Sequence, residues 1–168
     1  MKIYLAGGMK DNWQEFVQSE LPEHECINPK DWQHTEPDVY TYMDLDGVYR
    51  CDLVLAYMQK ENPSGIGMSL EIGYAVGIGK PVIFVNECDS KNFDIIEEIS
   101  SRVFSDLRDA IYFIKNLDNL DYIKRDYRKC NRCGKKLNDI KSIINGVGSG
   151  CLTKIDEKWN EMEKGSCE

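Results

Sequence analysis

Histidine is scarce in this sequence, and long hydrophobic runs are absent from it. Only two of the 168 residues are histidines, His24 and His34. Neither has a cysteine or an aspartate placed for a nucleophile relay, so we assign them no role. No apolar stretch approaches the roughly 20 residues of a membrane helix, and the N-terminus lacks the apolar core and cleavage site of a signal peptide. We therefore expect a cytoplasmic protein with no membrane partner.

The chain also lacks internal repeats and low-complexity tracts, and its composition is that of a globular protein. Hydrophobic residues make up 42% and charged residues 30% of the chain. These values exclude a wholly disordered chain, a collagen-like chain and a disulfide-stabilised miniature scaffold. The length predicts one domain, or one domain with a small appendage, and allows a core that needs no disulfide bonds.

Charge and cysteine are distributed unevenly along the chain. Residues 1–123 carry 10 Lys and Arg against 22 Asp and Glu, a net charge of −12, whereas residues 124–168 carry 11 against 7, a net charge of +4. Four of the seven cysteines lie in the last 39 residues, and clustered cysteines in a cytoplasmic protein indicate a metal rather than a disulfide. We predict a domain over residues 1–117, a charged linker over 118–129 and a small cysteine-rich module over 130–168.

Apolar segments alternate with amphipathic ones in the predicted domain. Strands are expected at residues 2–6, 25–28, 52–58, 82–85 and 102–104. Helices are expected at 13–21, with Asp11 as its cap, and at 40–50, 68–78, 93–100 and 107–117. This alternation predicts an α/β fold with a doubly wound, mostly parallel five-stranded sheet of the Rossmann or flavodoxin type, followed by the small C-terminal cysteine-rich module.

Glycines follow two of the predicted strands, at the edge where open α/β sheets bind ligands. Gly7 and Gly8 come directly after the first strand, and the loop 59–67 follows the third. The backbone amides around Gly65 and Gly67, at a helix N-terminus, could hold an anion or a sugar hydroxyl. These glycines match neither the dinucleotide fingerprint nor a Walker loop, so alone they specify no ligand.

Glu71 lies in a predicted helix whose other residues are almost all apolar or small. Such a helix should be buried on most sides, and a lone glutamate within it must be paired, hydrogen-bonded or functional. The helix N-terminus would favour its charged form, which a nucleophile requires. The alternative is that Glu71 faces solvent or caps a neighbouring backbone amide.

Several other residues have a plain structural interpretation. Tyr4, in the middle of the first strand, is best interpreted from the pattern alone as a core tyrosine bonded to a backbone carbonyl. Asp44 and Asp46 are expected on a solvated helix face. Trp32 lies in a loop that could border a pocket, but we expect it to pack rather than to stack on a ligand.

Three blocks of residues, in the same order, resemble the nucleoside 2-deoxyribosyltransferases and their relatives. The blocks are residues 2–9 (KIYLAGGM), 44–48 (DLDGV), and 63–75 (PSGIGMSLEIGYA) with 79–83 (GKPVI). Asp52 follows the second block as an aspartate follows the family's Asp-Leu-x-Gly-Ile segment. The resemblance covers residues 1–116 and is specific for the superfamily rather than for one activity.

The resemblance implies a retaining glycosyl transfer at the N-glycosidic bond of a nucleoside or deoxynucleoside, with no cofactor for catalysis. Glu71 matches the glutamate that attacks the sugar C1′ and forms a covalent glycosyl-enzyme. Tyr4 matches the tyrosine that orients this glutamate, and Asp44 matches the aspartate that handles the nucleobase proton. An incoming base gives transfer, and water gives hydrolysis. The predicted substrate-binding residues are Gly7, Gly8, Ser64, Gly65, Gly67 and Asn92.

The resemblance also implies a homo-oligomer acting on a small nucleoside or nucleotide, because the family borrows groups from a neighbouring subunit. Asn92 could be such a group. Two alternatives stay open. A hydrolase of nucleoside 5′-monophosphates would need phosphate-binding groups near residues 7–8 and 64, which Lys10 and Ser64 allow. A protein of the same fold could instead capture a nucleotide without cleaving it, although the three intact catalytic residue types argue against this.

The last 39 residues contain a zinc-knuckle pattern, Cys130-Asn131-Arg132-Cys133-Gly134, in which two thiolates can reach one tetrahedral ion. Seventeen residues separate Cys133 from Cys151, and 15 separate Cys151 from Cys167. The pattern resembles a small treble-cysteine module common in phage-encoded proteins. This resemblance implies a zinc-ribbon-like module with a structural zinc on the four cysteines. A reduced, metal-free knuckle is the alternative.

Residues 124–141 are strongly basic, with eight Lys and Arg against two acids. Such a segment could attract nucleic acid or a nucleotide phosphate. Aromatic residues for base stacking are sparse here, with Tyr122 and Tyr127 in the vicinity. A solvated basic surface is therefore slightly favoured over a nucleic-acid partner.

Overall fold

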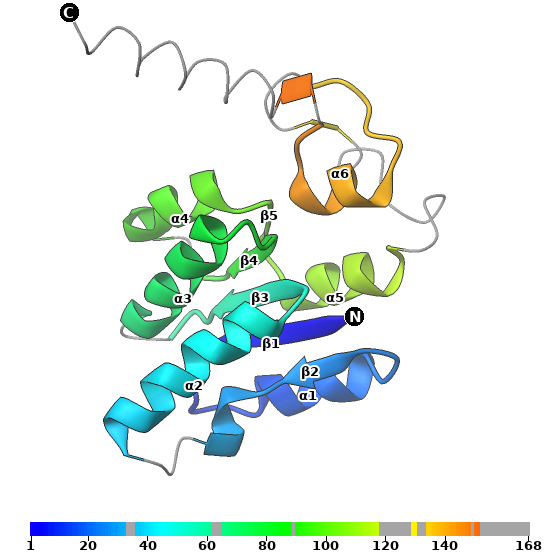
Figure 1. Ribbon diagram of the computed structural model, residues 1–168. Coiled ribbons are helices and arrows are strands. Elements are labelled where there is room, and N and C mark those ends of the chain that lie inside the picture. Colours follow the sequence, from blue (N-terminus) through cyan, green and yellow to red (C-terminus); the bar gives the residue numbers. More distant parts are fainter. Residues whose placement is uncertain are drawn as a thin grey trace, which may run out of the picture. The chain divides into compact units, whose positions relative to one another are not determined.

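The computed structural model describes residues 1–32, 36–61, 65–88, 90–117, 129–130, 134–148 and 150–151. The chain divides into two compact units, Met1–Lys115 and Asn116–Glu168, which we describe one at a time. The elements of the first unit are, in chain order, β1 (Lys2–Gly7), α1 (Trp13–Glu20), β2 (Glu25–Ile27), η1 (Pro29–Trp32), α2 (Pro37–Arg50), β3 (Leu53–Met58), α3 (Ile66–Gly77), β4 (Val82–Asn86), η2 (Lys91–Phe93), α4 (Asp94–Ile99), β5 (Arg102–Phe104) and α5 (Leu107–Lys115) (Figure 1).

The strands form one five-stranded sheet in the order β2-β1-β3-β4-β5, and every pair is parallel. In the register of the central strands, Tyr4 lies opposite Val54 and Val54 lies opposite Val82. The chain runs outward from β1 to β2 and then returns to β3 on the other side, so the topological switch point lies between β1 and β3. The predicted five-stranded parallel α/β sheet is confirmed.

Helices cover both faces of the sheet (Figure 1). Alternate strand residues such as Tyr4, Val54 and Phe84 form one core cluster with residues of α2, α3 and α4. On the opposite face, Tyr57 meets the Trp13 ring of α1 edge-on at 5.2 Å, and Phe104 meets Phe113 of α5 at 5.5 Å. This two-sided covering explains why every residue of β3 is buried and why β3 is an unbroken apolar run in the sequence.

One detail of the predicted helices is wrong. Asp11 does not cap α1, because Asn12 occupies the N-cap position and its side chain makes no capping hydrogen bond. The Asp11 carboxylate instead accepts a hydrogen bond from Gln59 Nε2 at 2.6 Å. The helix expected at 93–100 is present as α4, and it is preceded by the 3-10 turn η2, where the Ser90 side chain accepts a hydrogen bond from the Asn92 amide.

The prediction that the Glu71 helix is buried on most sides is also wrong. Only four residues of α3 are buried, namely Met68, Glu71, Ile72 and Ala75. Its opposite side is open, with Ile66 80% and Leu70 57% exposed. One side of the helix is therefore buried and the other is exposed, although both sides carry apolar residues.

The second unit has a small ordered part among its described residues. Lys129 and Lys136 form an isolated antiparallel bridge, and α6 (Ile140–Asn145) follows. Asp139 caps α6 by accepting from the Ser142 amide at 2.8 Å. Most of the predicted linker, Cys133 and Cys167 lie outside the described residues. Across the described residues of both units, no helix combines the length and hydropathy that a membrane span needs.

Candidate active site

A buried hydrogen bond between β1 and α3 forms the centre of the candidate site. The Tyr4 hydroxyl donates to Glu71 Oε1 at 2.9 Å across 67 residues of sequence. Tyr4 is fully buried and Glu71 is 7% exposed. Tyr4 points from β1 toward α2 and α3 because alternate strand residues face that side. The interpretation of Tyr4 as a tyrosine bonded to a backbone carbonyl is thus wrong, since its acceptor is the Glu71 carboxylate.

The environment of Glu71 raises its pKa to about 7. Burial is the main cause, because it penalises the charged carboxylate, and the negative charge of Asp44 adds to it. The Tyr4 hydroxyl acts in the opposite direction by stabilising the ionised form. The helix N-terminus was expected to favour the charged form, but α3 begins at Ile66 and Glu71 lies beyond its first turn, where the influence of the helix dipole has faded.

Asp44 is the third residue of this site and brings a second carboxyl group to it. It lies on α2, is half-buried, and is close enough to raise the pKa of both Tyr4 and Glu71. The pKa of Asp44 itself is raised, chiefly by burial. The expectation of a solvated helix face therefore fails for Asp44. It holds for Asp46, whose exposed carboxylate pairs with Arg50 Nε at 2.7 Å.

Trp32 is a site residue that the sequence did not identify. Its indole Nε1 donates to Asp44 Oδ1 at 2.7 Å, and this bond lowers the pKa of Asp44 against the effect of burial. The indole comes from η1, which follows the edge strand β2. In the sequence, Trp32 was recognisable only as a tryptophan in a loop after a predicted strand. This position does not indicate that its indole binds Asp44.

Gly47 allows the Tyr4 ring to lie against α2. A Cβ atom at position 47 would be 2.8 Å from Cε2 and 2.9 Å from Cδ2 of Tyr4. Gly47 is three residues after Asp44, so both lie on one side of α2. The Asp-Leu-Asp-Gly segment thus supplies a carboxylate and the space for the tyrosine beside it.

Residues 3–104 match the family model of the nucleoside 2-deoxyribosyltransferases. The chain belongs to this family. Membership makes it an enzyme that acts on the N-glycosidic bond of nucleosides. No curated protein matches the sequence.

Solved structures of similar fold agree with the family. The 2-deoxyribosyltransferase of Bacillus psychrosaccharolyticus is 20% identical with a TM-score of 0.55, over 66% of this chain and 90% of that one. The Clostridium botulinum CMP N-glycosidase BcmB is 23% identical with a TM-score of 0.51, over 68% and 98%. The 2-desoxiribosyltransferase of Leishmania mexicana is 20% identical with a TM-score of 0.52, over 68% and 97%. At these identities the likeness concerns the fold.

The other residues predicted for this nucleoside 2-deoxyribosyltransferase-family enzyme lie around the ends of β1 and β3. Gly7 ends β1 at a close approach, where a Cβ would be 2.7 Å from the Tyr57 carbonyl oxygen. The Gly8 carbonyl accepts from Trp13 Nε1 at 2.8 Å and so points toward α1. Gly65 is the left-handed N-cap of α3, and Gly67 is exposed in its first turn.

For two predicted substrate-binding residues, the described contacts show no link to the glycines at the ends of β1 and β3. Ser64 lies outside the described residues. Asn92 is exposed in η2, where its backbone amide donates to Ser90 Oγ at 3.3 Å. Its assignment to a neighbouring subunit's site stays a prediction.

Replacing Gly47 by alanine is expected to damage both stability and activity, because the new methyl group would displace the Tyr4 ring. Overpacking of this kind costs about 1–3 kcal/mol, and misplacing a catalytic group lowers kcat/KM by about 100-fold. Denaturant unfolding and a turnover assay measure the two effects. The matched control is Gly77→Ala in α3, where a Cβ meets nothing within 4 Å. Equal behaviour of the two variants would contradict the packing argument.

Proposed function

We propose that the chain exchanges the nucleobase of a deoxynucleoside or nucleoside through a covalent glycosyl–Glu71 intermediate. The observation that carries the proposal is the buried Tyr4–Glu71 hydrogen bond beside Asp44. It places a buried, oriented carboxylate next to a second carboxyl group with a raised pKa. Two carboxyl groups with different surroundings are what a double displacement at an acetal-like carbon requires.

In the first step, a Glu71 oxygen attacks C1′ of the sugar. The new C1′–O bond forms as the C1′–N bond breaks, and the base departs with the bonding electron pair. Asp44 donates a proton to the departing base and becomes a carboxylate. Tyr4 holds Glu71 Oε1 throughout, because its own raised pKa keeps the hydroxyl protonated.

In the second step, a ring nitrogen of another base attacks C1′ from the face that the first base left. Asp44 takes the proton of the incoming base, and the C1′–O bond to Glu71 breaks with its electrons returning to the carboxylate. Two inversions give net retention at C1′. Water in place of the second base, with its proton taken by Asp44, would give hydrolysis.

A chromatographic assay with the purified full chain tests this proposal. Each deoxynucleoside and each nucleoside 5′-monophosphate is incubated with and without a second free base, beside Glu71→Ala. A new nucleoside that forms only with the second base, and not with Glu71→Ala, is the expected result. Free base and sugar without exchange would replace the transferase by the 5′-monophosphate hydrolase. Absence of turnover with every substrate would overturn the catalytic assignment for these substrates.

We also propose that the enzyme is a homo-oligomer with copies joined through α2, α3 and α4. These helices carry highly exposed apolar side chains: Tyr42 is 76%, Ile66 80%, Leu70 57% and Ile95 67% exposed. The exposed side of α3 bears no charged residue, although 30% of the chain is charged. A copy packed there would cover the exposed side of the helix that holds Glu71. Sedimentation of the full chain, beside Leu70→Lys, tests this, and a concentration-independent monomer would contradict it.

The pH dependence of turnover should report the ionisation of Glu71. Because only the ionised carboxylate attacks, kcat/KM is expected to fall tenfold per pH unit below about 7. Tyr4→Phe removes the hydrogen bond that lowers the pKa of Glu71, so this limb should move to higher pH as the maximal rate falls. Tyr112→Phe, at an exposed position of α5, serves as control. An acid limb that Tyr4→Phe leaves in place would show that another group controls it.

A further inference from the structure

A tight chain reversal surrounds the first cysteine of the second unit. The Cys130 amide donates to the Lys135 carbonyl at 2.8 Å, and the Gly134 amide donates back to the Cys130 carbonyl at 2.9 Å. Gly134 has a φ of 69°, a left-handed conformation that favours glycine. In the sequence, Cys130 begins a Cys-x-x-Cys-Gly segment, whose cysteine spacing is that of a zinc ligand pair.

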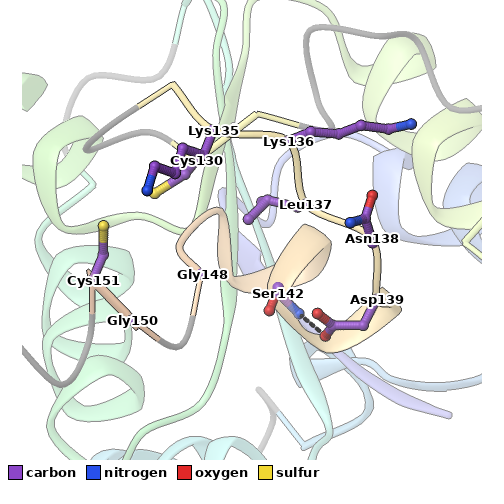
Figure 2. A pocket seen from close by; sticks show the side chains of 10 residues that line it. All are labelled: Cys130, Lys135, Lys136, Leu137, Asn138, Asp139, Ser142, Gly148, Gly150 and Cys151. Atoms are coloured by element: carbon purple, nitrogen blue, oxygen red, sulfur yellow. Dashed lines mark hydrogen bonds between the residues drawn. The ribbon is translucent and has the colours of Figure 1, made fainter.

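A second cysteine faces the same pocket from another part of the chain. Cys151 lies just after Gly148, to whose carbonyl its amide donates at 2.9 Å. Cys130 and Cys151 both line a pocket of about 450 Å³. Figure 2 shows their side chains on the same side of this pocket, with the sulfur atoms pointing into the space between them. The fold thus brings together two thiols that are 21 positions apart in sequence.

The described part of this unit has few buried apolar side chains. Among the described residues from 129 onward, the buried side chains are those of Cys130, Leu137 and Ile143. Modules of this size usually need a metal, disulfides or a partner to stay folded.

The charges around the pocket suit a thiolate-bound cation. Lys135 and Lys136 line it, and neighbouring cations favour the thiolate over the thiol. A zinc ion with three or four thiolates carries net negative charge, which these lysines offset. Asp139 also lines the pocket, but its Oδ1 is engaged as the cap of α6.

We propose that the C-terminal unit binds one zinc ion through the Cys130 and Cys151 thiolates. Cys133 and Cys167 are the thiolates that the sequence offers for the rest of a tetrahedral set, and both lie outside the described residues. The ion would fold the unit and would take no part in glycosyl transfer. A test of the zinc site is therefore independent of a test of the proposed function.

Metal analysis of the full chain, purified without chelator and supplied with zinc, tests the proposal. The expected result is about one zinc per chain by elemental mass spectrometry. Cys130→Ser and Cys151→Ser should each lose most of it, whereas Cys26→Ser, a half-buried cysteine of β2, should keep it. Absence of zinc from the wild-type chain, or full zinc retention in both Cys130→Ser and Cys151→Ser, would overturn the proposal.

A second measurement on the wild-type chain covers the case in which those variants misfold. Cobalt in place of zinc should give an intense thiolate-to-metal charge-transfer band. A chelator should increase the number of thiols that react quickly with a thiol reagent, because metal-bound thiolates are protected. Absence of the band together with equal thiol reactivity with and without chelator would overturn the proposal.

Discussion

Glu71→Gln is expected to abolish turnover, with kcat falling by about four to six orders of magnitude. An amide cannot form the glycosyl ester, whereas its shape and its carbonyl oxygen still suit the Tyr4 hydroxyl at 2.9 Å. Substrate binding should therefore persist while chemistry is lost. Measuring kcat together with nucleoside affinity by calorimetry separates the two effects.

The matched control is Glu98→Gln, an exposed glutamate of α4, which should turn over like the wild type. Glu71→Ala with added azide gives a further check. Azide in the space of the missing carboxylate should attack C1′, release the base and give a glycosyl azide of inverted configuration. A Glu71→Gln enzyme within tenfold of wild type would remove Glu71 from the chemistry.

The same substitution should stabilise the fold above neutral pH. The pKa of Glu71 rises from an ordinary 4.5 to about 7 in the folded chain, so the unfolded chain releases this proton first as pH rises. The wild type should thus lose unfolding free energy from pH 4.5 through about 7, about 3 kcal/mol in all. Glu71→Gln has no such charge and should avoid this loss. Denaturant unfolding of both proteins at pH 5 and pH 8 provides the comparison, and parallel pH dependence would contradict it.

The sheet was predictable because buried strands have a simple sequence pattern. A parallel strand covered on both faces can carry apolar residues at every position, and β3 does. Glu71 was predictable for the complementary reason. A charged residue that is buried with an apolar helix destabilises the fold unless it is paired or hydrogen-bonded.

The rest of the site depends on contacts that local pattern does not contain. Asp44 was expected on a solvated helix face, but the Trp32 indole and the Tyr4 hydroxyl, which come from other elements, are its hydrogen-bond partners. The role of Gly47 is set by the Tyr4 ring, which comes from another element. Periodicity shows which residues share a face, but it does not show what covers that face.

The exposed side of α3 illustrates the same limit. Its apolar composition predicted burial within the domain, but Ile66 and Leu70 remain open in a single chain. Composition did not distinguish burial in the chain's own core from burial against a second copy, which is the alternative that the homo-oligomer proposal adopts.

Asp44→Asn should have the second-largest effect, a fall in kcat of about 100- to 10,000-fold with little change in KM. Asparagine keeps an oxygen for the Trp32 indole but cannot deliver a proton to the departing base. Asp46→Asn, an exposed neighbour paired with Arg50, is the control and should behave like the wild type. Steady-state kinetics on one good substrate measure the loss.

The choice of substrate reveals whether Asp44 transfers the proton. A nucleoside whose base leaves readily without protonation should recover most of its rate in Asp44→Asn, whereas a poor leaving group should not. The acid limb of the pH profile should also move to lower pH, because Asp44 no longer raises the pKa of Glu71. A uniform loss over all leaving groups would make Asp44 a positioning residue instead.

Trp32→Phe separates the hydrogen bond from the carboxyl group itself. It removes the 2.7 Å donor but leaves Asp44 able to carry a proton. Loss of this donor raises the pKa of Asp44 further, since the bond lowers it now. If protonated Asp44 is the acid, the limb of the kcat/KM profile that Asp44 controls should move to higher pH, with a rate loss of about tenfold, smaller than that of Asp44→Asn. A pH profile that Trp32→Phe leaves in place would mean that Asp44 controls neither limb, and that Trp32 serves the packing of α2 alone.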